Sequence, residues 1–120
     1  MRYLIFVFLM ASLSMCTNHS EEGLYGDNDT PCDTANVSFS DDVFPIIEDE
    51  CLPCHGTSSP PLGISLNTYS AIREVAETSR LLGAIKHQPG YTPMPQNAPK
   101  LNECKIATIE AWIDDGMPEN

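Results

Sequence analysis

The chain has 120 residues, which is enough for one small domain. It carries 17 acidic and 6 basic residues, a formal net charge of −11. Because nucleic-acid-binding proteins present basic patches, this charge argues against a nucleic-acid partner and favours a protein partner with a basic docking patch.

Residues 1–15 are predicted to form a signal peptide. Arg2 precedes an apolar run, and small residues follow before Cys16. The run is shorter than the roughly 20 residues of a membrane-spanning helix, so we expect export. The stretch "LSMC" resembles the lipobox of bacterial lipoproteins, although Met15 departs from the usual small residue. We expect a lipid on Cys16, with ordinary cleavage nearby as the alternative, and a membrane-anchored protein in the periplasm or at the cell surface.

Residues 16–31 are polar, acidic and broken by Gly and Pro, which is typical of a flexible stalk. The folded domain is expected over 32–120. A domain of this size buries a limited core, so a cofactor, a disulfide or both should stabilise it. No alternating apolar pattern predicts strands, and the class expected is all-α.

The first helix is expected over 41–51, "DDVFPIIEDEC". Asp41 or Asp42 can cap it, and Pro45 is tolerated in its first turn. One side of this segment is apolar, with Val43, Phe44, Ile46 and Ile47.

The stretch "CLPCH", Cys51 to His55, follows directly and has the C-x-x-C-H pattern of covalent haem attachment. In such a site two thiols add across the two vinyl groups of the porphyrin, and the next histidine binds the iron. Helical geometry brings Cys51, Cys54 and His55 to one side of the chain. Export agrees with this interpretation, because haem is attached to such chains outside the cytoplasm.

Two other interpretations of "CLPC" stay open. A thioredoxin-like dithiol lies between a strand and a helix, whereas a helical segment precedes this motif. A structural zinc site needs further ligands at matching spacing, and the candidates after Cys54 are the isolated His87 and Cys104.

Two further helical segments are expected before the C-terminal helix. Thr68 can cap "TYSAIREVAET", residues 68–78. The stretch "SRLLGAIKH", 79–87, either continues this helix or forms a separate turn.

Met94 lies in "YTPMPQN" between Pro93 and Pro95. The prolines fix φ and remove backbone donors, and a stiff loop suits a weak thioether ligand to haem iron. Ordinary loop packing is the alternative for Met94. His87 is the next candidate for the sixth iron ligand, and Met117 is a weaker one.

The last helix is predicted over 103–115. Asn102 can cap it, apolar residues recur at helical spacing, and Gly116 fits its C-terminal end. Cys104 lies in its first turn, and Cys32 lies at the start of the domain. In an oxidising compartment two such cysteines usually pair, and two unpaired thiols are the alternative.

From about residue 39 to 117 the chain resembles a class I cytochrome c domain. The resemblance rests on "DVFPIIEDECLPCHG", "GISLNTYSAI", "YTPMP" and "IATIEAWIDDGMP". It implies a cytochrome c fold, with three to four helices around one covalently bound haem c. The first and last helices should then cross above the haem.

The resemblance also implies the ligand set. Cys51 and Cys54 would form the thioether bonds, His55 would be the proximal iron ligand and Met94 the distal one. The carbonyl of Pro60 or Pro61 would hold the His55 ring. Trp112 and Tyr69 would pack near the haem, with ordinary core packing as the equal alternative. An early "CDT" and a late "L-x-x-C" support pairing of Cys32 with Cys104.

The function expected is electron transfer by a monomeric monohaem cytochrome rather than an enzyme, because no substrate-pocket signature or general base is visible. One alternative is a thiol-disulfide oxidoreductase that uses Cys51 and Cys54. Another is a haem sensor or subunit domain with His87 or nothing as the sixth ligand.

Overall fold

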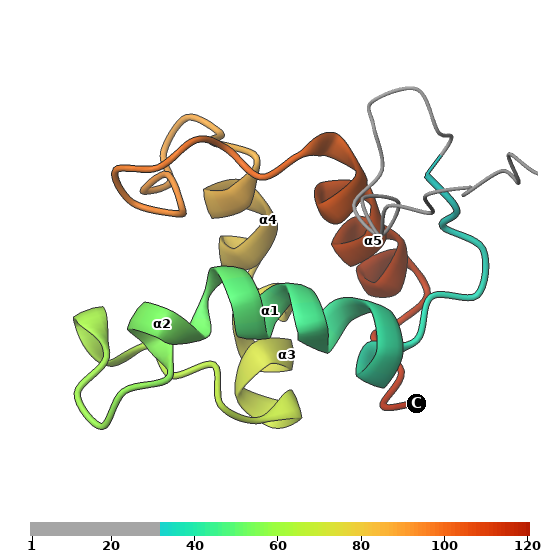
Figure 1. The fold of residues 1–120 in the computed structure, drawn as a ribbon, viewed down its shortest axis with the longest axis horizontal. Helices are drawn as coiled ribbons and strands as arrows, with labels where there is room; N and C mark the ends of the chain where they lie inside the picture. Colours follow the sequence, from blue (N-terminus) through green and yellow to red (C-terminus); the bar gives the residue numbers. More distant parts are fainter. Residues whose placement is uncertain (1–31) are drawn as a thin grey trace, which may run out of the picture. The chain divides into compact units, whose positions relative to one another are not determined.

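The computed structural model describes residues 32–120. The predicted signal peptide, the lipid site at Cys16 and the stalk over 16–31 lie outside the described residues. Within 32–120 the chain forms helices and no strand, so the all-α class is confirmed (Figure 1). None of the helices in this range is long and apolar enough to cross a membrane.

The first helix combines a π-helical segment, η2 (Phe39–Val43), with α1 (Phe44–Glu50). Its N-cap is Ser38, whose hydroxyl accepts a hydrogen bond from the Asp41 backbone N–H at 3.3 Å. The Asp42 carboxylate accepts one from the Ser38 N–H at 2.8 Å. The prediction that Asp41 or Asp42 caps this helix is therefore wrong. These two hydrogen bonds resemble a capping box and start the helix earlier, at Ser38.

The middle of the chain forms four short elements. Thr68 caps the third of them, the helix Tyr69–Glu77, as predicted, because its side chain accepts a hydrogen bond from the Ala71 N–H at 3.3 Å. Ser79, with φ 58°, interrupts the helical backbone. The stretch 79–87 therefore forms a separate helix and does not continue the previous one. The elements are α2 (Leu52–His55), the 3₁₀ turn η3 (Pro61–Gly63), α3 (Tyr69–Glu77) and α4 (Arg80–Ile85).

The C-terminal helix α5 (Glu103–Asp114) begins and ends close to its predicted bounds. Asn102 caps it by accepting a hydrogen bond from the Lys105 N–H at 2.8 Å. Gly116 follows the helix with φ 87°, a left-handed conformation that glycine adopts without strain.

An aromatic cluster joins the two ends of the domain. The Trp112 ring of α5 is fully buried and lies 5.5 Å from the Phe39 ring of η2, between ring centroids. The Tyr69 ring lies 5.0 Å from Phe39 and 6.4 Å from Trp112. Trp112 Nε1 donates to the Pro118 carbonyl at 2.9 Å, so the one polar atom of this ring is satisfied. The rest of the core is mainly aliphatic and includes Val43, Ile47, Ile72, Ile85, Ile106 and Ile109.

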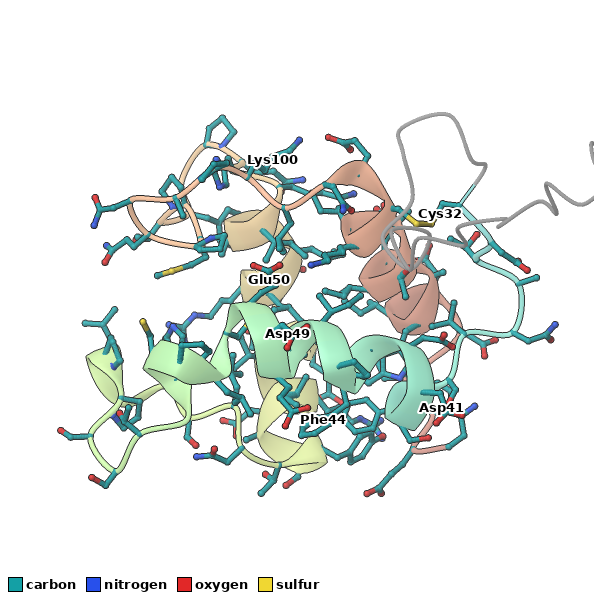
Figure 2. All side chains as sticks on the ribbon, viewed as in Figure 1. Cys32, Asp41, Phe44, Asp49, Glu50 and Lys100 are labelled. Carbon is teal, nitrogen blue, oxygen red and sulfur yellow. A yellow bond between two sulfur atoms is a disulfide. The ribbon has the colours of Figure 1, made fainter. Side chains whose placement is uncertain are left out.

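Two further links hold α5 against the N-terminal part of the domain. Cys32 and Cys104 form a disulfide with Cα atoms 5.4 Å apart (Figure 2). Such a bond closes a long loop and typically stabilises a small domain by about 2–4 kcal/mol. Lys105 of α5 also forms an ion pair with Glu50 of α1 at 2.5 Å.

Candidate functional site

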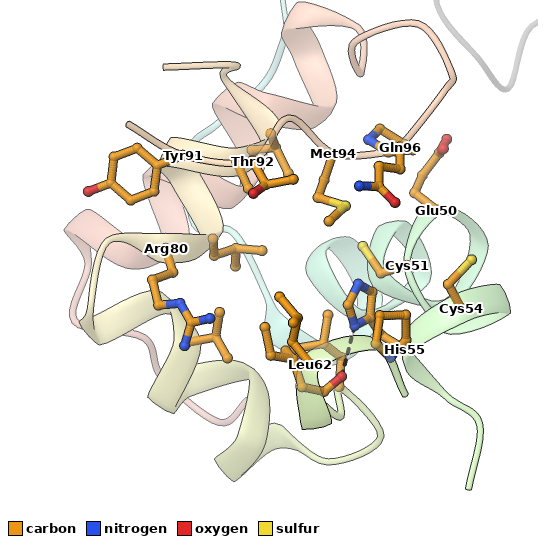
Figure 3. Close-up of a pocket in the computed structure, with 18 of the residues that line it drawn as sticks. Glu50, Cys51, Cys54, His55, Leu62, Arg80, Tyr91, Thr92, Met94 and Gln96 are labelled. Carbon is orange, nitrogen blue, oxygen red and sulfur yellow. Dashed lines mark hydrogen bonds between the residues drawn. The ribbon is translucent and has the colours of Figure 1, made fainter. Parts of the chain in front are cut away.

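A cavity of about 450 Å³ opens beside α2, and the two proline-rich loops contribute to its walls. This volume lies in the range of small-molecule and cofactor sites. The helices α3 and α4 supply one wall, and the segment from Gly90 to Gln96 supplies another (Figure 3). Most of the lining is apolar, with Ile64, Leu66, Val75, Leu81, Ile85 and Leu101.

The His55 ring is the most buried polar group of this site, with 9% of the residue exposed. Its Nδ1 lies 2.8 Å from the Ile64 carbonyl oxygen. Because a carbonyl only accepts, Nδ1 carries the proton, and Nε2 keeps its lone pair for a ligand. Figure 3 shows the ring at the cavity with this hydrogen bond drawn. A ring held in this way presents its unprotonated nitrogen, Nε2, in a fixed orientation.

The expectation that Pro60 or Pro61 holds this ring is wrong. The Pro60 carbonyl accepts from the Gly63 N–H at 3.0 Å, and the Pro61 carbonyl accepts from the Ile64 N–H at 3.1 Å. Both carbonyls are used within the turn. Leu62 has φ 56°, in the left-handed region, and beyond this turn the Ile64 carbonyl is the one that meets the His55 ring.

Cys51 and Cys54 lie on the same side of the cavity as His55 (Figure 3). The helical turn that contains them is continuous, since the His55 N–H donates to the Cys51 carbonyl at 2.8 Å. Neither thiol is in a disulfide; Cys51 is partly buried and Cys54 is exposed. Burial, together with the charge of Glu50, raises the pKa of the Cys51 thiol to about 11.

This pKa argues against Cys51 as the attacking thiol of a dithiol pair. A reactive dithiol needs a thiolate at neutral pH, and the Cys51 thiol with its raised pKa is protonated there. The zinc interpretation also lacks ligands in this part of the chain. Among residues 32–120, no three His, Cys, Asp or Glu side chains are grouped so that they could hold a metal ion.

Met94 lines the cavity from the loop that faces α2. In Figure 3 its thioether and the His55 ring point toward one another from opposite walls. The Met94 backbone is fixed on both sides: its N–H donates to the Ala84 carbonyl at 3.0 Å, and its carbonyl lies 3.1 Å from His87 Nε2. The structure therefore brings Cys51, Cys54, His55 and Met94 to one cavity.

The other candidates from the sequence lie elsewhere. His87 is not among the residues that line the cavity, and its ring contacts the Met94 backbone. Met117 packs against the core, and its carbonyl accepts from the Tyr69 hydroxyl at 2.6 Å. Trp112 and Tyr69 belong to the aromatic cluster with Phe39 and do not line the cavity. Of the two alternatives for these rings, core packing is the one observed.

Two further residues of the site were not predicted from the sequence. Arg80 lines the cavity from the start of α4, and Tyr91 lines it from the loop. The Tyr91 ring lies directly over Gly83: a Cβ at Gly83 would be 2.5 Å from ring carbons. An isolated glycine in a helical pattern signals such a close approach, so "LLG" could have indicated this contact.

Comparison of the chain with protein-family models, with curated proteins and with solved structures found no match. The function is therefore inferred from the cavity and the residues that line it.

Proposed function

We propose that residues 32–120 form a cytochrome c domain that carries one covalent haem c and transfers single electrons. The observation that carries this proposal is the position of His55 and Met94 on opposite walls of one apolar cavity, with Cys51 and Cys54 at its edge. Haem iron, when bound, supplies the one-electron redox couple.

Each residue of this set has a defined task. Cys51 and Cys54 hold the group by thioether bonds. His55 binds the iron through Nε2, while the Ile64 carbonyl fixes its ring. Met94 fills the position that a haem enzyme leaves open, which favours an electron carrier over an enzyme.

Arg80 suits the carboxylates that haem carries on the edge opposite its vinyl groups. Figure 3 places Arg80 across the cavity from Cys51 and Cys54. The other basic side chains of 32–120 are each in an ion pair, whereas Arg80 has none within this range. Arg80 is solvent-exposed, and a guanidinium that lines an apolar cavity can pair with an anionic group on the occupant. The ion-paired residues are Arg73, Lys86, Lys100 and Lys105.

The cellular setting is part of the proposal. In this proposal the predicted signal peptide leads to export, and a lipid on Cys16 holds the domain at a membrane outside the cytoplasm. The net charge of −11 favours redox partners with a basic docking patch, because opposite charges speed encounter.

The carrier function is tested by a redox titration of the holoprotein with Met94→Ala. The wild type is expected to follow a reversible one-electron curve. Met94→Ala should lower the midpoint potential and bind added imidazole readily, because a thioether ligand stabilises ferrous iron and blocks the sixth position. Absorption spectra and the midpoint potential measure both effects.

Met117→Ala is the matched control, since Met117 packs on the core outside the cavity. It should leave the spectrum unchanged. An unchanged spectrum in Met94→Ala would remove Met94 as a ligand and favour the haem sensor or subunit alternative.

The role of Arg80 gives a separate prediction. Arg80→Gln should lower the midpoint potential, because loss of the positive charge favours ferric iron. A tenfold change in the redox equilibrium corresponds to about 59 mV for one electron, and a shift up to this size is expected. Arg80→Lys should keep most of the wild-type potential. Arg73→Gln, which removes an exposed charge paired with Glu77, is the control. Equal shifts in Arg80→Gln and Arg73→Gln would contradict a specific role for Arg80.

A further inference from the structure

His87 has a backbone conformation that favours glycine. It follows α4 with φ 55°, in the left-handed region. The Gln88 N–H donates to the Gly83 carbonyl at 2.9 Å, and the His87 N–H donates to the Ala84 carbonyl at 3.2 Å. These two bonds form a Schellman motif, in which glycine is the common residue at the position of His87. In this protein the position carries a histidine, whose side chain makes a contact that glycine could not make.

The side chain reaches the loop that carries Met94. His87 Nε2 lies 3.1 Å from the Met94 carbonyl oxygen. Since the carbonyl only accepts, Nε2 carries the proton and donates. The Met94 N–H donates in turn to the Ala84 carbonyl at 3.0 Å. Both backbone polar groups of Met94 are thus bonded to the end of α4.

The two prolines on either side of Met94 cannot supply a hydrogen-bond donor in place of His87. Pro93 and Pro95 lack a backbone N–H, so neither can donate a hydrogen bond from this part of the loop. The same helix α4 supplies Leu81, Ala84 and Ile85 to the cavity wall. The bond from His87 therefore links Met94 to the helix that forms this wall.

We propose that His87 is a positioning residue that holds the Met94 thioether at its depth in the cavity. The inference rests on the proposed function, in which Met94 is the sixth iron ligand. A thioether is a weak iron ligand. The fraction of molecules in which Met94 binds the iron therefore depends on how firmly the Met94 backbone is held. His87 acts through Met94 and does not line the cavity itself.

The test compares His87→Gly, His87→Gln and the wild type as ferric holoproteins at one pH, with imidazole as the probe. Imidazole must displace Met94 to bind, so its affinity measures how firmly Met94 is held. His87→Gly is expected to bind imidazole about fivefold to tenfold more tightly, the size of one lost hydrogen bond. His87→Gln keeps a donor and should recover part of the wild-type affinity.

Two further measurements separate positioning from general stability. His87→Gly should unfold at the same or a higher temperature than the wild type, because glycine suits φ 55°. The Met94 amide proton should exchange faster in the reduced His87→Gly protein, since its bond to Ala84 loosens. Amide exchange does not depend on imidazole binding.

Asn97→Gly is the matched control. Asn97 lies in the same loop with φ 60° and an exposed side chain. Asn97→Gly removes a left-handed side chain without removing the bond to Met94, so imidazole affinity and Met94 exchange should stay at wild-type values.

Equal imidazole affinity in His87→Gly and the wild type would overturn the proposal, as would equal gains in His87→Gly and Asn97→Gly. Failure of the proposed function has a different signature. In that case the wild type itself would bind imidazole as tightly as Met94→Ala, or would carry no haem.

Discussion

Replacing both Cys51 and Cys54 with serine is expected to give a chain that carries no covalent haem. Both sulfurs lie at the cavity edge beside His55, and the structure leaves both out of disulfides. Without these sulfurs no thioether bond can form. Any bound haem should then separate from the polypeptide when the protein is unfolded. The measurement is the haem absorbance that stays with the denatured, desalted chain.

The control removes the other cysteine pair of the domain. Cys32→Ser with Cys104→Ser deletes the disulfide, which joins α5 to the start of the domain and lies outside the cavity lining. This variant should keep its covalent haem and lose about 2–4 kcal/mol of unfolding free energy. Full haem retention in the Cys51→Ser, Cys54→Ser variant would contradict the attachment site.

Trp112→Ala is expected to cause the largest loss of stability of any single substitution proposed. Trp112 is fully buried, contacts the Phe39 ring, and donates from Nε1 to the Pro118 carbonyl. Truncation of such a side chain typically costs about 3–5 kcal/mol, because it removes buried apolar surface and leaves a cavity. Urea unfolding of the holoprotein measures this loss.

Trp112→Phe is the matched variant. It keeps an aromatic ring but leaves the Pro118 carbonyl without its donor, so a smaller loss than in Trp112→Ala is expected. The haem spectrum of the folded fraction should not change in either variant, because Trp112 does not line the cavity. A loss below about 1 kcal/mol in Trp112→Ala would contradict its place at the centre of the core.

Local signals in the sequence predicted much of the helical structure. Asn102 and Thr68 cap α5 and α3 as expected, since each accepts from a backbone N–H three residues ahead. The start of the first helix was predicted wrongly. The Ser38 hydroxyl accepts from the Asp41 N–H, and the Asp42 carboxylate accepts from the Ser38 N–H, so these two bonds place the start at Ser38.

The four residues that the sequence singled out line one cavity, whereas the groups that hold them in place were not predicted. The spacing of Cys51, Cys54 and His55 is local, and the prolines around Met94 are visible in the sequence. The carbonyl that holds His55 depends on the left-handed turn at Leu62, which no sequence rule indicates for a leucine. The approach of His87 to the Met94 carbonyl also depends on a left-handed residue. Contacts that follow from unusual backbone angles are the part that sequence patterns do not show.

The haem proposal is tested most directly on the wild-type chain, produced by export in cells that contain the haem-attachment machinery. The purified protein is unfolded, separated from free haem, and its pyridine haemochrome spectrum is recorded. A c-type spectrum that stays with the polypeptide is the result we predict. A colourless chain with two titratable thiols at Cys51 and Cys54 would contradict the proposal and favour the dithiol alternative.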